Sequence, residues 1–212
     1  MDPLLLTLFI IVSVLLVLAI LTLIFYPKIK LAKLKKDFVS VYGKKVYRYA
    51  LHNDLYLINR LELRGNDNST ISVDHLLFGT KYIYVITDYY LNGLIEAKEK
   101  DRSFLFTPDE KDAKKIYIDN PLIASKRLAK SVANNIGLNE SLFISIVLLN
   151  DGAQLTNFES TSKDNFIVHL HSFHRLINQL ESRNVAPLND NQLRYTVKDV
   201  NKLNVRNKNK SN

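Results

Sequence analysis

The order of hydrophobic and polar positions in this 212-residue chain predicts most of its elements. Leu4–Tyr26 is dominated by Leu, Ile and Val and carries no charge. Apolar residues recur at three- and four-residue spacing over 37–53, which predicts an amphipathic helix. Runs rich in β-branched and aromatic residues over 55–63, 71–78 and 82–88 predict strands, because such side chains fit a pleated, half-buried surface. The chain therefore passes from a long apolar segment into a domain of helices and strands.

Turn and cap residues divide the rest of the chain. Gly79 lies between the strands over 71–78 and 82–88, and Asn92-Gly93 predicts a second tight reversal. Asn120-Pro121 and Gly137 predict the two ends of a helix. The remaining predicted elements are strands over 103–107, 115–119, 142–149 and 166–170 and helices over 121–136 and 172–183. Together they predict an α/β fold, in which a mixed sheet is flanked by helices and preceded by one transmembrane helix.

The apolar segment is long enough to cross a membrane. Its 23 residues would span about 34 Å as a helix, against a hydrocarbon core of about 30 Å. A cleaved signal peptide is the alternative, and it requires a basic start and a small-residue cleavage site. This chain begins Met-Asp-Pro and continues from the apolar segment as Tyr26-Pro27-Lys28. The segment is therefore predicted to be a membrane anchor.

Five lysines and no acidic residue follow the anchor within residues 27–36. Because positive charge is retained on the cytoplasmic side, we expect a single-pass protein of the cell membrane with its N-terminus outside and its domain in the cytoplasm. The same lysines are expected to bind the anionic lipid surface, although setting the orientation is by itself a sufficient role for them. They are Lys28, Lys30, Lys33, Lys35 and Lys36.

The net charge of +8 belongs to the flanks of the domain. Residues 37–190 hold 18 Lys or Arg against 19 Asp or Glu, which argues against a nucleic-acid surface spread over the whole domain. Cysteine is absent, which excludes disulfides, thiolate metal sites and a cysteine nucleophile. The predicted division is an anchor at 1–27, a basic juxtamembrane segment at 28–36, a cytoplasmic domain at 37–186 and a basic, weakly ordered tail at 187–212.

Several short strings lie between residues 40 and 180. They are Leu57-Ile58-Asn59-Arg60-Leu61, Val73-Asp74-His75-Leu76-Leu77, Tyr82-Ile83-Tyr84-Val85-Ile86, Asn92-Gly93 and Asn120-Pro121-Leu122. In these strings and in the order of its elements, the domain resembles the nuclease-related domain (NERD) family. The resemblance implies the fold of a restriction-endonuclease core. In active members it also implies a divalent cation, usually Mg²⁺, held by carboxylates on adjacent strands.

The chain keeps only part of the catalytic pattern that this resemblance implies. The family pattern has a Glu in the first helix, an Asp on the first hairpin strand, and Glu-x-Lys on the second strand. The Asp corresponds to Asp74, whereas the Glu of the helix falls at Lys44 and the Glu-x-Lys positions fall at Thr87 and Tyr89. Asp88 is a poor replacement, because side chains alternate along a strand. A nuclease-like fold with a degenerate active site is therefore predicted.

A shifted register offers an alternative catalytic set. Glu96-Ala97-Lys98 is itself a Glu-x-Lys string, so Asp74, Glu96 and Lys98 are the predicted catalytic residues if the domain is active, with Mg²⁺ as the cofactor. The competing interpretation is an exposed, charged turn. Three-residue motifs arise readily by chance.

Two further clusters have ordinary alternatives. His169, His171 and His174 are low-ranking candidates for metal ligands, and surface histidines are the commoner explanation. The tyrosines near the hairpin are candidates for stacking on single-stranded nucleic acid, and filling one face of the sheet is the preferred explanation for Tyr82 and Tyr84.

The sequence predicts a membrane-anchored, catalytically inactive nuclease-related domain that acts as a binding module for a protein or a nucleic acid. No cofactor is expected unless the domain is active. The first alternative is a divergent Mg²⁺-dependent DNA or RNA nuclease. The second is a structural, membrane-associated assembly factor.

Overall fold

The computed structural model describes residues 12, 14–18, 20–22, 40–65, 69–110 and 112–208. The chain separates into two compact units, Met1–Ser40 and Val41–Asn212. Most of the predicted anchor, and all of the lysines at 28–36, lie outside the described residues. Within the part that is described, no helix combines the length and the apolar character needed to cross a bilayer.

The described strands form two sheets. The main sheet has five strands in the order β1-β2-β3-β7-β9, and the small sheet has four in the order β6-β5-β4-β8. The strands are β1 Tyr56–Arg64, β2 Thr70–Phe78, β3 Ile83–Tyr89, β4 Gly93–Glu96, β5 Ser103–Pro108, β6 Ile116–Asp119, β7 Phe143–Leu149, β8 Ala153–Thr156 and β9 Asn165–His169. The main sheet is antiparallel from β1 to β3 and parallel from β3 to β9. Its mixed character confirms the α/β prediction.

Helices flank the main sheet, as predicted. One is described over residues 40–52. The others are α2 Pro121–Ile136, α3 Phe173–Glu181, α4 Asp190–Leu203 and α5 Val205–Lys208, with 3-10 turns η1 Glu140–Leu142 and η2 Leu170–Ser172. Asn120 caps α2 by accepting the Leu122 amide at 2.9 Å, and Gly137 ends it with a left-handed φ of 71°. The predicted bounds of this helix are confirmed because both signals are local.

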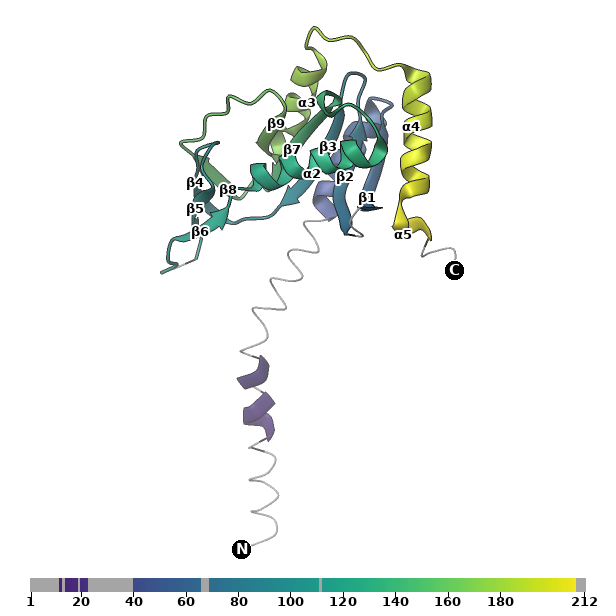
Figure 1. Cartoon of the computed structure of the whole chain (residues 1–212). Coiled ribbons are helices and arrows are strands. Elements are labelled where there is room, and N and C mark those ends of the chain that lie inside the picture. Colours follow the sequence, from purple (N-terminus) through teal and green to yellow (C-terminus); the bar gives the residue numbers. More distant parts are fainter. Residues whose placement is uncertain are drawn as a thin grey trace, which may run out of the picture. The chain divides into compact units, whose positions relative to one another are not determined.

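The two faces of the main sheet are covered by different helices. Val132 and Ala133 of α2 are buried in the same cluster as Leu76, and α2 crosses the front of the sheet in Figure 1. His75, the neighbour of Leu76 on β2, points to the opposite face, where the helix over 40–52 approaches it at Gly43. A single continuous sheet therefore separates the α2 side from the side that holds His75.

The predicted reversal at Asn92-Gly93 is wrong. β4 does not pair with β3, and it lies instead in the small sheet between β5 and β8. Gly93 has a φ of +139°, and a side chain at this position would collide with the backbone of Thr107 and Pro108. Glycine is needed here because the chain leaves one sheet and approaches a strand of another closely. β8 was also not predicted from the sequence.

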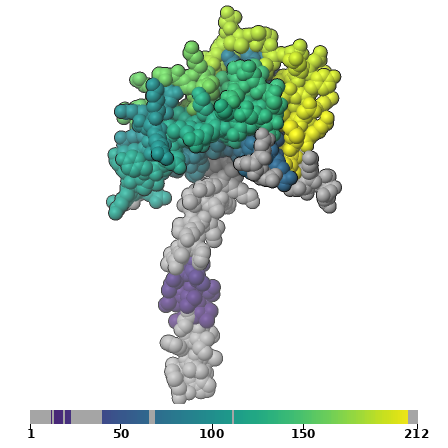
Figure 2. All heavy atoms as spheres, viewed as in Figure 1, coloured from purple at the N-terminus to yellow at the C-terminus, as the bar shows by residue number. Residues whose placement is uncertain are grey.

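The expectation of weak order after Pro187 also needs correction. Asn189 caps α4 by accepting the amides of Asn191 and Gln192. Leu193 and Val197 pack against the core cluster that contains β1, and Val200 is 1% exposed within it. In Figure 2, α4 forms part of the surface of the domain, coloured yellow. An apolar stripe at three- and four-residue spacing is buried against β1, and this burial orders the helix.

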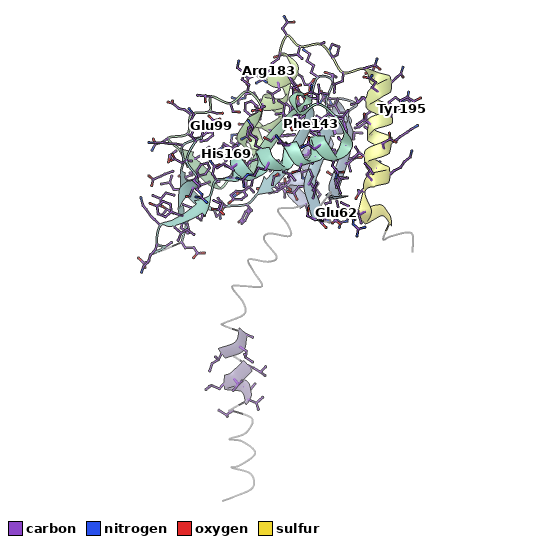
Figure 3. The ribbon with its side chains drawn as sticks, viewed as in Figure 1. Glu62, Glu99, Phe143, His169, Arg183 and Tyr195 are labelled. Carbon is purple, nitrogen blue, oxygen red and sulfur yellow. The ribbon has the colours of Figure 1, made fainter. Side chains whose placement is uncertain are left out.

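The packing of α4 predicts a measurable contribution to stability. Val200→Ala is expected to lower the free energy of unfolding by about 1–2 kcal/mol, because it leaves a cavity beside β1. Tyr195→Ala is the control, because Tyr195 is 69% exposed and lies on the outer side of the same helix (Figure 3); it should change stability by less than about 0.5 kcal/mol. Urea unfolding of the purified chain measures both. Equal effects would mean that α4 does not pack as described.

Candidate functional site

The candidate site lies where the parallel strands of the main sheet end. β3, β7 and β9 run in the same direction, so their carboxyl ends meet at one edge of the sheet. Asp88 lies near the end of β3, Asp151 follows β7, and His169 ends β9. Ligands of open α/β sheets bind preferentially outside the carboxyl ends of the strands. The polar side chains at this edge are therefore the first candidates for function.

A buried hydrogen-bonded chain links three strands at this edge. The Nδ1 of His75 lies 2.6 Å from Oδ1 of Asn59, and its Nε2 lies 3.0 Å from Oδ2 of Asp88. The exposed fractions of the His75 and Asp88 side chains are 4% and 10%. Cross-strand register explains the grouping, because Asn59 pairs with His75, His75 pairs with Ile86, and Asp88 is two residues beyond Ile86 on the same face.

The partner of Nδ1 determines the direction of one of these hydrogen bonds. Because the carbonyl oxygen of Asn59 is an acceptor, Nδ1 of His75 donates to it. Nε2 is then the nitrogen that faces the carboxyl group of Asp88, and the two side chains are buried together at the edge of the sheet.

Asp74 is directed to the same place. Its Oδ2 accepts the backbone N–H of Asp88 at 2.9 Å. Across from it on β1, Arg60 has a left-handed φ of 54° and interrupts the ladder, so that Ile58 and Leu61, three residues apart, are both buried in one cluster. A non-glycine residue in this conformation is uncommon and costs of order 1–3 kcal/mol. The alternation of inward- and outward-facing residues along β1 therefore shifts by one residue beside Asp74.

The charges of this group act on one another. Burial, the largest effect, raises the pKa of Asp88, and the Asp74 charge adds to this rise, while the hydrogen bond and charge of His75 and the charge of Arg60 oppose it. Among the described residues, Oδ1 of Asp88 and Oγ1 of Thr87 are buried without a hydrogen-bond partner. A buried, unpaired carboxylate oxygen is costly. Asp88 is therefore the most constrained acid of the site.

The helix over 40–52 closes one side of the group. Tyr42 is 1% exposed and its hydroxyl donates to the backbone oxygen of Tyr89 at 3.3 Å. Burial raises the pKa of Tyr42 well above its ordinary value, and the charges of Asp88 and Asp151 raise it further. Tyr42 stays protonated and acts as a hydrogen-bond donor.

A second, exposed pair lies at the ends of β7 and β9. Oδ1 of Asp151 accepts the backbone N–H of His171 at 3.0 Å and lies 2.7 Å from its Nδ1. Partial burial raises the pKa of Asp151, but the hydrogen bonds and charge of His171, with the charge of His169, outweigh it and lower the pKa overall. Asp151 therefore stays ionised beside the histidines.

The three histidines proposed as metal ligands are not brought together. The rings of His169 and His171 stack at 5.5 Å, and Nε2 of His169 is 2.8 Å from the backbone oxygen of Ala153. His174 packs instead against Tyr49, with ring centroids 4.9 Å apart. In the described ranges, no group of three or more His, Asp or Glu side chains is arranged to hold a metal ion.

The alternative catalytic set is not brought together either. Asp74 lies in the main sheet, whereas Glu96 lies in the small sheet, where its Oε1 is 2.9 Å from Nζ of Lys115. Lys98 lines a surface pocket that also contains Glu99 and Glu159. In Figure 1 the strands of the small sheet stand apart from β2. The sequence did not predict a second sheet. Glu96 and Lys98 were therefore expected to lie near Asp74, in the same sheet.

The sequence predicted Asp88 to be a poor replacement for the catalytic acid, and its grouping with His75, Asn59 and Tyr42 was not predicted. A signal for the pairing of His75 with Asp88 was present, because the short turn after Phe78 sets the hairpin register and thereby places both residues on one face. No comparable signal linked Asn59 or Tyr42. The tyrosines of the hairpin fill the sheet face, as preferred: Tyr84 is 0% exposed and its hydroxyl donates to Glu181.

The raised pKa of Asp88 predicts the pH dependence of stability. The folded state binds the proton of Asp88 more tightly than the unfolded state does. The resulting contribution to the free energy of unfolding is fully present below the ordinary pKa of 3.8, and it is lost as the pH rises through the pKa of Asp88 in the folded state. We therefore expect Asp88→Asn, which cannot ionise, to gain stability relative to the unmodified chain as the pH rises above about 4.

Urea midpoints measured across this range test the prediction. Asp151→Asn is the matched control, because a lowered pKa places its change in stability below about pH 4 and gives it the opposite sign. Parallel pH profiles for the two variants would contradict the assigned direction for Asp88.

One comparison with known proteins, that with a family model, agrees with the fold described above. No curated protein matches the sequence. One solved structure, titled as a protein of unknown function, AF1548, is 10% identical, with 79% of this chain and 96% of that chain covered and a TM-score of 0.33, a likeness too low to support an argument. The family model described as the nuclease-related domain matches residues 38–150, more than half of the chain. With a mixed α/β fold that is consistent with a restriction-endonuclease core, the chain belongs to the nuclease-related domain (NERD) family.

Proposed function

We propose that this is a single-pass membrane protein whose cytoplasmic nuclease-related domain has lost hydrolytic activity and acts as a binding module for a protein or a nucleic acid. One observation carries the proposal. The acidic side chains at the edge of the main sheet are bound within the protein, Asp74 by a backbone amide and Asp88 by His75.

Metal-dependent hydrolysis requires more than this edge offers. Mg²⁺ takes oxygen ligands in near-octahedral geometry and is usually bound by one or two carboxylates that face the substrate phosphates. Thr87 and Tyr89 occupy the positions where the family pattern has Glu and Lys. Asp88 is directed to His75 and is largely buried. The chain therefore keeps the fold of the family while the acidic groups at this edge are occupied by contacts within the protein.

The membrane part of the proposal is supported by the sequence. Leu4–Tyr26 is 23 residues without a charge, and five lysines follow it directly. A helix of this length matches the hydrocarbon core, and the lysines favour the cytoplasmic side. The anchor holds the domain at the inner surface of the cell membrane.

The surface of the domain offers partners two kinds of contact. Arg194, Lys198 and Lys202 are exposed at four-residue spacing along α4, which suits phosphate groups. Tyr117, 79% exposed on the edge strand β6, suits a protein partner. Salt-dependent binding of DNA distinguishes the two, because contacts with phosphates weaken steeply as salt rises.

Loss of hydrolysis is tested with the full chain in detergent. We expect no cleavage of single- or double-stranded DNA or RNA with Mg²⁺ or Mn²⁺, and Asp74→Asn should behave like the unmodified chain. Asp190→Asn, at the exposed start of α4, controls for the change in charge. Metal-dependent cutting that Asp74→Asn abolishes and Asp190→Asn spares would overturn the proposal. Glu96→Gln and Lys98→Ala would then test the alternative catalytic set.

The anchor is tested by fractionating cells that express the chain. The full chain is expected to remain in membranes washed with alkaline carbonate, whereas a chain without residues 1–26 should be released, because the apolar helix supplies the attachment. Protease added to intact spheroplasts should leave the domain uncut, and protease added to inverted vesicles should cut it. Release of the full chain by carbonate would exclude a spanning helix.

A further inference from the structure

The helix over residues 40–52 has an unusual outer face. Its inner residues, such as Tyr42 and Val46, are buried in the domain. Its exposed side carries three large apolar residues, Val41, Tyr47 and Leu51, which are 45%, 53% and 68% exposed. We call the exposed set Val41, Lys44, Tyr47, Arg48 and Leu51 the outer helix face.

The outer helix face combines apolar and cationic side chains in one stripe. Val41, Lys44, Arg48 and Leu51 follow one another at three- and four-residue spacing, and Tyr47 lies three residues after Lys44 and four before Leu51, so all five lie on the same side of the helix. Lys44 and Arg48 lie among the apolar residues, and residues 40–52 contain no Asp or Glu. A helix that only borders solvent carries a polar outer side. Aromatic and aliphatic residues with Lys and Arg are typical of helices that lie in a membrane interface.

We propose that the outer helix face lies on the anionic lipid surface of the membrane that holds the chain. The inference rests on the membrane anchor proposed above. Two features select lipid as the occupant. The face is cationic, which complements anionic headgroups, and its first residue, Val41, follows the end of the apolar segment at Tyr26 by 14 intervening residues, five of which are lysines.

This short connection raises the local concentration of lipid at the helix. A tether of 14 residues spans at most about 50 Å when extended, so the outer helix face stays within reach of the headgroups throughout. Binding then becomes an intramolecular step that needs little intrinsic affinity. Tyr47 and Leu51 would enter the headgroup region, while Lys44 and Arg48 contact lipid phosphates.

Docking would also set the direction of the candidate site. Tyr42 and Gly43, on the inner side of the same helix, lie against Tyr89 and His75. A helix held by lipid on one side and by the site on the other gives the domain one preferred orientation on the membrane. The edge of the main sheet would then face partners from a fixed direction.

The chain contains no tryptophan, so a single substitution introduces a unique fluorophore. The full chain with Tyr47→Trp is placed in lipid nanodiscs of neutral phosphatidylcholine or of phosphatidylcholine with anionic phosphatidylglycerol. In anionic discs we expect a blue-shifted emission and quenching by brominated lipid, and in neutral discs both should weaken. Tyr117→Trp, on β6 and 79% exposed, is the matched control and should stay red-shifted and unquenched.

Charge reversal tests the cationic contribution. Lys44→Glu with Arg48→Glu in the Tyr47→Trp chain should reduce the docked fraction in anionic discs by about fivefold or more for each cation removed. Arg127→Glu with Lys130→Glu, which changes the charge equally on the exposed side of α2, across the main sheet from the helix over 40–52, should leave it unchanged. In the Tyr47→Trp chain without the charge reversals, added salt should release the outer helix face from anionic discs.

The outcomes distinguish failure of the anchor from failure of lipid docking. Chain that fails to co-elute with discs overturns the anchor and this inference together. Chain that co-elutes while the Tyr47→Trp fluorophore stays unquenched in anionic discs overturns docking and leaves the anchor in place. Equal quenching of the Tyr47→Trp and Tyr117→Trp chains would mean unspecific collapse and overturn the assigned face. A blue shift that depends on the number of chains per disc, and not on lipid charge, would overturn lipid docking and identify a second copy as the occupant.

Discussion

The parallel pairing of β7 between β3 and β9 is the constraint on which the rest of the domain depends. All seven residues of β7 are buried, so both faces of the main sheet need a cover. α2 provides one, and the side that holds His75 is covered by the helix over 40–52. Parallel pairing also brings the carboxyl ends of β3, β7 and β9 to one edge. The polar residues that follow these strands meet there as a consequence of topology.

At that edge the buried carboxyl group of Asp88 is paired with another side chain of the protein. Burying an isolated carboxylate is too costly to tolerate, and Asp88 is accommodated by His75, whose other nitrogen is held by Asn59. The same arrangement removes Asp88 from any role as a freely accessible metal ligand. The contact that accommodates Asp88 in the sheet therefore also supports the proposed loss of a nuclease-type site.

The helix over 40–52 connects the candidate site with the outer helix face. Its inner side supplies Tyr42 to the site, and its outer side presents apolar and cationic residues. α3 is joined to the central hairpin in a comparable way, because Glu181 accepts hydrogen bonds from Tyr84, from the hydroxyl of Thr80 and from the amide of Lys81. The hairpin is thus fixed from several directions, and the edge of the main sheet inherits that rigidity.

The sequence by itself determined the elements whose signals are local. The caps of α2 at Asn120 and Gly137, the apolar run of β7 and the hairpin around Gly79 need nothing beyond their own neighbours, and the short strings along them were sufficient to identify the family. Tertiary structure decided what depends on distant partners. α4 is ordered because Val200 meets β1, and Gly93 carries the chain into a second sheet. His75 meets Asp88 only through cross-strand register, since the face that a strand residue occupies is set by pairing and not by its own identity.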